Sequence, residues 1–207
     1  MKIKDFLVEQ WMNAYEDGAK YNIAETCVDS LSLNQLFELL GNGEEVLDDI
    51  INTRLTYGHI FGSPELKKHI GDMYGGISEK NIITTNGAIG ANFLSMYSLI
   101  EPGDEVVSVL PTYQQMYSIP ESFGANVKIL QLRPENNFLP DVDELKALVS
   151  KNTKMICINN PNNPTGSLIS EDMLIEIVEI AKEVDAYVHS DEVYRGLYQE
   201  EDVEIPS

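Results

Sequence analysis

The sequence contains few basic residues. Lysine and arginine together number 14 in a chain of 207 residues, against 34 aspartate and glutamate residues, and the formal net charge at pH 7 is −20. A surface this acidic repels phosphate groups, because too few cations are present to neutralise them. The composition therefore argues against nucleic acid and against an anionic membrane surface as partners.

Cysteine and long apolar segments are also scarce. Cys27 and Cys157 lie far apart and provide no metal-ligand spacing, and the three histidines show none either, so no metal site is predicted. No segment approaches the roughly 20 apolar residues that a membrane-spanning helix needs. No apolar run follows a basic start at the N-terminus, so we expect no signal peptide and predict a cytoplasmic location.

The chain does contain a regular alternation of short apolar segments and amphipathic segments. The expected strands are residues 81–85, 105–110, 126–132, 153–159 and 186–190. The expected helices are residues 87–100, 141–150, which Asp141 starts, and 170–184, which Ser170 caps, with a helical or mixed segment at 112–124. Strands that alternate with helices of this length are typical of βαβ units. The pattern predicts an α/β fold with a mostly parallel sheet covered by helices on both faces.

The N-terminal part of the sequence has helical patterns without this alternation. Amphipathic helices are expected at residues 4–17 and 30–41, the second with Ser32 as its N-cap and Gly41 as its stop signal. We therefore predict two parts. Residues 1–45 form a helical N-terminal arm, and residues 46–207 form part of a larger ligand-binding domain.

The residues that follow the expected strands are informative, because open parallel sheets bind ligands at the carboxyl ends of their strands. A turn of small residues, 86–89, precedes a helix, and its backbone N–H groups suit an anion. Tyr113, the asparagine-rich segment 159–166, Asp191 and Tyr194 follow the later strands. Each feature alone has an ordinary structural explanation. Together they supply what is needed to hold a flat, phosphorylated heteroaromatic ring.

These segments resemble a known family. The sequences NGAIGANFLSMYSLIEPGDEVV, PTY, NNPNNPTG and SDEVY occur in the order seen in the pyridoxal-phosphate enzymes of fold type I, specifically the class I/II aminotransferases. The similarity extends from Tyr57 to Leu197, which is most of the chain. It implies an enzyme that transfers an amino group between an amino acid and a 2-oxo acid, with pyridoxal 5′-phosphate as its cofactor.

The resemblance gives each residue at the strand ends a role. It implies that Gly87, Ala88 and Ile89 cradle the cofactor phosphate, that Tyr113 stacks on the ring, that Asn163 and Tyr194 contact the ring hydroxyl oxygen, and that Asp191 pairs with the ring nitrogen. The other asparagines of the segment, Asn159, Asn160 and Asn162, are expected to satisfy backbone groups of the turn. Tyr57 matches a family tyrosine that reaches the cofactor phosphate of the neighbouring subunit, which implies a homodimer.

Some residues that this family uses are missing. The sequence has no lysine after Lys182, so the lysine that forms a Schiff base with the cofactor is not in the chain, and no catalytic residue is assigned. The later arginines that bind the cofactor phosphate and the substrate carboxylate are missing too. We expect a truncated chain that lacks the C-terminal domain of the family and is inactive by itself.

Other functions remain open from the sequence. A carbon–sulfur β-lyase uses the same fold and cofactor, although Tyr194 favours transamination because lyases often have histidine at this position. Decarboxylase-like and cyclase-like relatives are further alternatives. A catalytically inactive aminotransferase-like domain with a binding role would keep the fold without the lysine. A dinucleotide-binding domain is disfavoured, because the turn at Gly87 lacks the three spaced glycines of that fingerprint.

Overall fold

The computed structural model describes residues 2–24, 26–197 and 206. The chain divides into two units: Met1–Phe6 with Pro64–Ser207, and Leu7–Ser63. The first unit contains a β-sheet with its covering helices, and the second contains the helices α1, α2 and α3.

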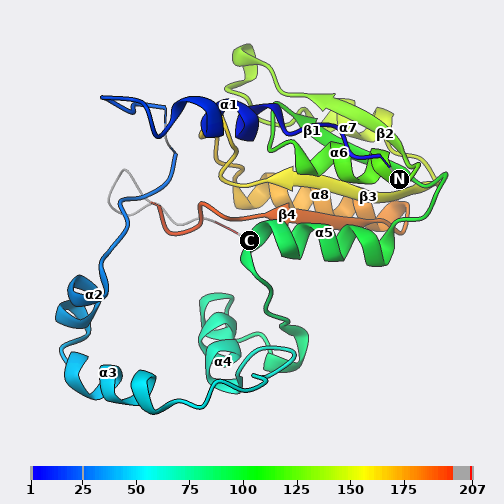
Figure 1. The fold of residues 1–207 in the computed structure, drawn as a ribbon. Helices are drawn as coiled ribbons and strands as arrows, with labels where there is room; N and C mark the ends of the chain where they lie inside the picture. The colour runs from blue at the N-terminus through cyan, green and yellow to red at the C-terminus, as the bar shows by residue number, and fades with distance from the viewer. Residues whose placement is uncertain (1, 25, 198–205, 207) are drawn as a thin grey trace. The chain divides into compact units, whose positions relative to one another are not determined.

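The sheet of the first unit is parallel throughout. Its strands are β1 (Glu105–Leu110), β2 (Asn126–Gln131), β3 (Thr153–Asn159) and β4 (Tyr187–Asp191), and they lie side by side in the order β2-β1-β3-β4 (Figure 1). Because β1 and β3 occupy the centre, they are apolar on both faces and almost entirely buried. The predicted parallel sheet is confirmed.

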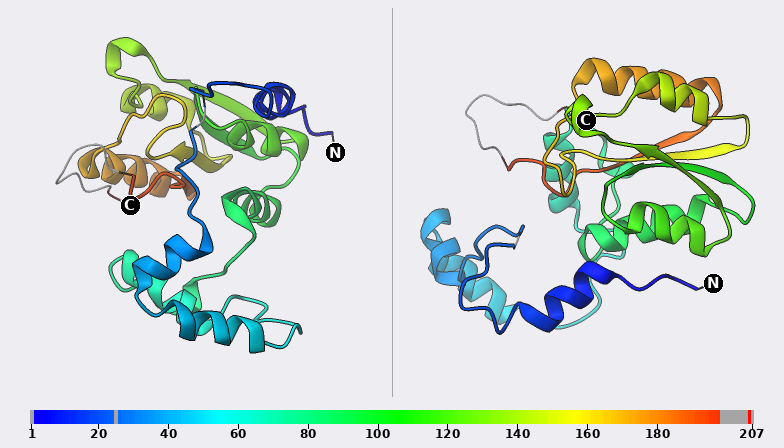
Figure 2. Two further views of the ribbon diagram at one scale, coloured as in Figure 1. Left: turned by 60° about the vertical axis from the view of Figure 1, so that its left-hand side comes forward. Right: turned by 90° about the horizontal axis from the view of Figure 1, so that it is seen from above.

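Helices cover both faces of this sheet, as Figure 2 shows in its right-hand view. On one face, α5 (Gly87–Leu99) and α6 (Gln115–Ser122) pack against alternate strand residues such as Val106 and Met155. On the other face, α7 (Val142–Leu148) and α8 (Glu171–Glu183) pack against Val107 and Ile156. Neighbouring residues of a strand point to opposite faces, so each central strand serves two cores. The predicted α/β class is confirmed.

Side-chain caps start several of these helices where the sequence predicts them. The Asp141 carboxylate accepts hydrogen bonds from the first turn of α7, and the Ser170 hydroxyl accepts one from the Met173 N–H of α8. Such caps satisfy backbone N–H groups that have no partner within the helix. The remaining short elements of this unit are α4 (Pro64–Met73) and the 3₁₀ turns η1 (Glu79–Asn81) and η2 (Pro134–Asn136).

One predicted strand is wrong. Residues 81–85 do not form a strand, since Asn81 ends the 3₁₀ turn η1 and residues 82–85 belong to no helix and to no strand of the described sheet. A β-branched composition favours extended backbone, but a strand also needs a neighbour to complete its hydrogen bonds. The predicted helix that follows is present as α5.

The second unit is helical, as predicted for the N-terminal part. Its elements are α1 (Leu7–Tyr15), α2 (Leu33–Leu40) and α3 (Gly43–Asn52). Ser32 and Gln35 form a reciprocal capping box at the start of α2, and Gly41 ends it with a left-handed backbone at φ +73°. The predicted boundary between residues 45 and 46 remains a prediction. Among the described helices, none is long and apolar enough to cross a membrane.

A nearly buried carboxylate, Glu105, connects the amino ends of β1 and β3 and pairs with the partly exposed Lys128 of β2. The Glu105 carboxylate of β1 lies 2.7 Å from the Lys128 ammonium group and accepts hydrogen bonds from the Thr153 and Ser150 hydroxyls at 2.6 and 3.0 Å. Burial alone would raise the pKa of Glu105, but the hydrogen bonds from these three partners outweigh burial and hold the pKa below its ordinary value of 4.5.

This pair makes stability dependent on acidity in a defined direction. Because the folded pKa of Glu105 is lowered, its contribution is complete above the unfolded value and is lost as the pH falls through the folded value. We expect Glu105→Gln to lower the free energy of unfolding by about 2–3 kcal/mol at pH 7, with the difference from wild type shrinking below about pH 4. Urea unfolding of the full-length wild-type and variant proteins at pH 7 and at a pH below about 4 measures this effect.

The matched control is Glu144→Gln. Glu144 pairs with Arg133 on the surface, where solvent screens the interaction. We expect a much smaller loss from this substitution at pH 7. Equal losses from the two variants, or a Glu105→Gln difference that does not change with pH, would contradict the role assigned to Glu105.

Candidate active site

The sequence-predicted site residues of the first unit lie at one edge of the sheet. The strands β1, β3 and β4 run in parallel and end at Leu110, Asn159 and Asp191. Their carboxyl ends therefore meet at the same edge, which is where open α/β sheets bind ligands. The segments that follow these strands are connected to one another by side-chain hydrogen bonds.

Asp191 is a nearly buried carboxylate at the end of β4. Asp191 is only 5% exposed to solvent. The oxygen Oδ1 accepts a hydrogen bond from the Val193 N–H at 3.0 Å, and Oδ2 accepts one from the Asn92 amide at 2.7 Å. Both donors are neutral, and among the described residues no lysine or arginine pairs with this carboxylate. A buried negative charge without a cation is costly, so the position suits a positively charged ligand group.

Asn163, in the loop after β3, and Tyr194, three residues after Asp191, lie together. The Asn163 side-chain amide donates to the Tyr194 hydroxyl oxygen at 3.2 Å. The Asn163 backbone N–H donates to Asn159 Oδ1 at 2.6 Å, which holds the loop at the end of β3. The structure thus brings together the two residues that the sequence analysis assigned to one ligand oxygen.

The other asparagines of this loop hold the chain in place. Asn159 donates from its side chain to the Asp191 carbonyl at 2.8 Å, and the Asn160 Oδ1 accepts from the Ile169 N–H at 2.9 Å. Asn162 donates to the Pro111 carbonyl at 3.2 Å and therefore ties this loop to the one after β1. These side chains were expected to satisfy backbone groups of their own turn, but Asn159 and Asn162 also bond to the carbonyls of Asp191 and Pro111 and so connect separate strand ends.

The first turn of α5 has the features of an anion site. Gly87 has a left-handed backbone at φ +73°. This conformation is unfavourable for residues that carry a side chain. Ala88 and Ile89 are exposed, and the preceding Asn86 makes no capping hydrogen bond with its side chain. The leading N–H groups of a helix lack partners within the helix and carry its positive dipole end.

The other two predicted tyrosines, Tyr113 and Tyr57, occupy different units. Tyr113 lies in the loop after β1, is half-buried, and its ring contacts the Phe6 ring edge-on at 5.2 Å between centroids. Tyr57 belongs to the second unit and its side chain is fully exposed. The residues that the structure brings together at the sheet edge are therefore those of the first unit.

The structure adds three polar residues that the sequence analysis did not assign. Asn92 of α5, Gln115 of α6 and His189 of β4 form hydrogen bonds around the Asp191 carboxylate. Signals in the sequence point to two of these three residues. Asn92 is one of few polar residues in an apolar helix, and His189 is two residues before Asp191, which places both on one face of the strand. His189 was assigned no role from the sequence beyond the observation that the histidines lack metal-ligand spacing.

Burial lowers the pKa of His189, and the negative charge of Asp191 opposes this shift without cancelling it. The imidazole ring is therefore neutral at pH 7. A neutral imidazole donates one hydrogen bond and accepts another, so its contacts have a defined direction.

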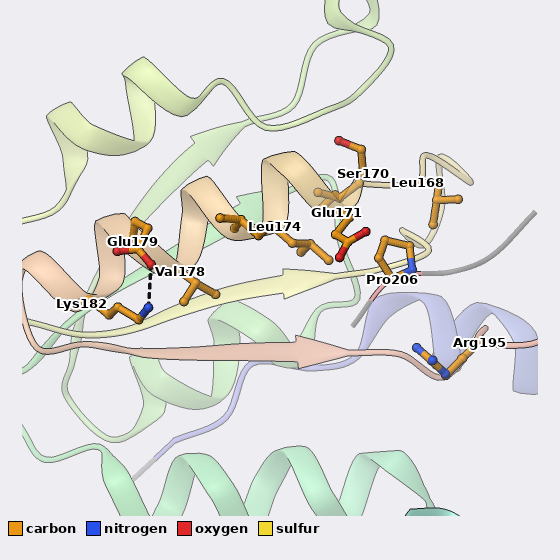
Figure 3. Close-up of a pocket in the computed structure, with 11 residues that line it drawn as sticks. Leu168, Ser170, Glu171, Leu174, Val178, Glu179, Lys182, Arg195 and Pro206 are labelled. Carbon is orange, nitrogen blue, oxygen red and sulfur yellow. Dashed lines mark hydrogen bonds and ion pairs between the residues drawn. The ribbon is translucent and has the colours of Figure 1, made fainter. Parts of the chain in front are cut away.

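A cavity of about 730 Å³ lies elsewhere, along the outer side of α8 (Figure 3). Leu174 and Val178 form its apolar side, and Lys182 and Glu179 form an ion pair of 2.6 Å at one end. None of the residues with an assigned role lines this cavity. The candidate site is therefore defined by its converging polar groups rather than by this cavity.

The family model described as aminotransferase class I and II matches residues 39–205 of the chain. Among curated proteins, the aspartate aminotransferase of Pyrococcus horikoshii is 37% identical over 150 residues, which cover 70% of this chain and 38% of the relative. The aspartate aminotransferase of Thermotoga maritima is 36% identical over 135 residues, covering 64% of this chain and 35% of the relative. The chain thus spans a little over a third of these relatives.

Solved structures of aminotransferases are also similar to this chain. A PLP-dependent aminotransferase from Streptococcus suis 89-1591 superimposes with a TM-score of 0.94 and 50% identity, over 100% of this chain and 55% of that one. The aspartate aminotransferase of Thermus thermophilus with maleate has a TM-score of 0.71 and 27% identity, over 79% and 44% of the two chains.

The loop after β3 provides a test of how the sheet edge is held. Asn159→Ala removes the acceptor of the Asn163 N–H and one donor to the Asp191 carbonyl. We expect a loss of about 2–3 kcal/mol in the free energy of unfolding, because buried backbone groups lose their partners. Asn163→Ala removes only the contact with Tyr194 and should cost less than about 1 kcal/mol. Urea unfolding of the full-length protein distinguishes the two variants. Equal losses of stability would contradict the role of Asn159 in holding the loop.

Proposed function

The chain belongs to the aminotransferase class I and II family, and we propose that it forms the cofactor-binding part of an amino-acid aminotransferase that uses pyridoxal 5′-phosphate. The observation that carries the proposal is the nearly buried Asp191 carboxylate, whose hydrogen bonds come from neutral groups. The protonated nitrogen of a pyridine ring is the positive partner that such a carboxylate needs.

The surrounding residues fit the remaining groups of this cofactor. The N–H groups at the start of α5, from Gly87 to Ile89, would bind its phosphate. Asn163 and Tyr194, which are already within hydrogen-bonding distance of each other, would both contact the ring hydroxyl oxygen. Tyr113, in the loop after β1, would stack on the face of the ring.

The proposed chemistry requires that Asp191 stays ionised. When bound, the cofactor supplies an electron sink for the negative charge that remains after the α-proton of an amino acid is removed. The role of Asp191 is to hold a proton on the ring nitrogen by charge attraction, since a carboxylate near a cation favours the charged form of both. The hydrogen bonds from Val193 and Asn92 keep the carboxylate oriented while it does so.

We propose transamination between an amino acid and a 2-oxo acid as the reaction. Names of the curated relatives support this, since those described above are aspartate aminotransferases. Tyr194 also favours it over a carbon–sulfur β-lyase. Because the sequence contains no lysine after Lys182, we propose that these 207 residues are inactive alone, and that a lysine elsewhere in the full-length protein completes the site. The scarcity of cysteine supports a cytoplasmic location, which cell fractionation would test.

The central test is Asp191→Asn in the full-length protein. The substitution keeps the shape of the side chain but removes its charge, so we expect cofactor to bind while transamination falls by about 10²–10³-fold or more. Activity is measured with a panel of amino acids and a 2-oxo acid acceptor, and cofactor content by absorbance. Tyr194→Phe is the milder comparison, with an expected loss of about 10-fold from one hydrogen bond.

Two outcomes would contradict the proposal. An Asp191→Asn variant with wild-type activity would show that the carboxylate does not act on the ring nitrogen. Release of ammonia, pyruvate and a thiol from cysteine S-conjugates, without amino-group transfer to a 2-oxo acid, would identify a lyase instead. The 207-residue chain serves as an inactive reference in both assays.

We also propose a homodimer in which Tyr57 reaches the cofactor phosphate of the partner subunit. The support is the full exposure of this side chain and its match to the family motif. If sites are shared, each one combines Asp191 from one subunit with Tyr57 from the other. Two defective variants would then restore one complete site in a mixed dimer.

Mixed dimers of Tyr57→Phe and Asp191→Asn subunits test this arrangement. Refolding the two variants together at equal amounts gives random pairs, so we expect about a quarter of the wild-type activity, well above either variant alone. Light scattering verifies the dimer. Activity that equals the mean of the separate variants would contradict a shared site.

A further inference from the structure

In the described part of the chain, the Asn92 side chain links the Asp191 carboxylate to the first turn of α5 through Gln115. Its Nδ2 donates to Asp191 Oδ2 at 2.7 Å and to Gln115 Oε1 at 3.2 Å. Gln115 in turn donates from Nε2 to the Ile89 carbonyl at 2.8 Å, in the first turn of α5. Asn92 therefore connects the Asp191 carboxylate with the turn that begins at Gly87.

The orientation of the Asn92 amide is determined by its neighbours. An ionised carboxylate only accepts hydrogen bonds, so the NH₂ group of Asn92 must face Asp191 and its oxygen must face away. That oxygen, Oδ1, lies 3.0 Å from His189 Nε2. With His189 neutral, Nε2 has to carry the ring proton for this contact to be a hydrogen bond. On the other side of the ring, the Ser95 hydroxyl lies 3.3 Å from Nδ1.

All hydrogen-bonding groups of the Asn92 side chain are thus used, and the residue is only 4% exposed. A buried amide with complete partners has a single favourable orientation, since a flip would place its oxygen against the carboxylate. Among the described residues, the donors to the Asp191 carboxylate are Asn92 and the Val193 N–H, one on each oxygen. Each oxygen therefore keeps an acceptor position for a ligand.

We propose that Asn92 is a positioning residue that aims the Asp191 carboxylate at the ring nitrogen of the cofactor, and that His189 holds Asn92 in the orientation this requires. This inference rests on the proposed function, because it assumes that Asp191 binds the ring nitrogen. It gives Asn92 of α5 and His189 of β4 a role in orienting Asp191, and neither residue belongs to the strand-end motifs.

The test compares two ligands that differ only at the ring nitrogen. One is pyridoxal 5′-phosphate, and the other is its analogue with a C–H group in place of that nitrogen. The full-length wild-type protein should bind the first more tightly, because only the first pairs with Asp191. We expect Asn92→Leu to weaken binding of the cofactor by about 10- to 100-fold and to leave binding of the analogue nearly unchanged. Dissociation constants are measured by absorbance titration without turnover.

His189 variants test the second half of the proposal. Gln carries an N–H near the position of the imidazole Nε2, so His189→Gln should keep the preference for the cofactor over the analogue. His189→Leu removes the donor and should reduce the preference in the same direction as Asn92→Leu. Thr153→Val is the matched control, since it removes a buried hydrogen bond to Glu105 at the opposite end of the sheet. It should lower stability without changing the preference.

The outcomes separate this inference from the proposed function. If the wild-type protein binds both ligands equally, Asp191 does not bind the ring nitrogen, and the proposed function fails together with this inference. If the wild type prefers the cofactor and Asn92→Leu keeps that preference, the positioning role alone is overturned. Should Asn92→Leu not fold, the comparison of His189→Leu with His189→Gln decides, and equal preferences in those two variants overturn the proposal.

Discussion

The buried carboxylate of Asp191 is the constraint on which the site depends. Asp191 lies at the end of β4. Its backbone carbonyl accepts hydrogen bonds from the side chain of Asn159, the last residue of β3, and from the N–H of Asn160 in the loop that follows. Its side-chain oxygens accept from the Val193 N–H and from Asn92. These donors fix the position of a negative charge without neutralising it. The buried negative charge of Asp191 therefore favours binding of a cationic ligand group, which compensates it.

The loops at the sheet edge are positioned by one another rather than by the strands alone. Asn162 ties the loop after β3 to Pro111 after β1, and Asn163 contacts Tyr194 after β4. Gln115 at the start of α6 holds the first turn of α5 through the Ile89 carbonyl. Because buried amides have strict requirements for donors and acceptors, these contacts determine the spacing between an anion-binding turn and a carboxylate.

Prediction from the sequence succeeded where the controlling interactions are local. The caps at Ser32, Asp141 and Ser170 lie where expected, because each bonds to backbone groups within three residues of itself. The central strands were recognised because both faces are buried, which requires continuous apolar residues. Residues 81–85 have a similar composition but no partner strand in the described part of the chain, and composition does not reveal a partner.

The sequence by itself determined the α/β class and the order of the strand-end motifs, which follow from periodicity and from residues adjacent in the chain. The assignment of Asp191, Asn163 and Tyr194 to one candidate site came from the resemblance of these motifs to a known family. Only the tertiary structure decided that Asn92, 99 residues before Asp191, contacts its carboxylate, and that His189 and Gln115 complete the hydrogen bonds of Asn92. The physical reason is that a hydrogen bond between distant residues depends on how α5 and α6 pack on the sheet, and the local sequence pattern does not specify that packing.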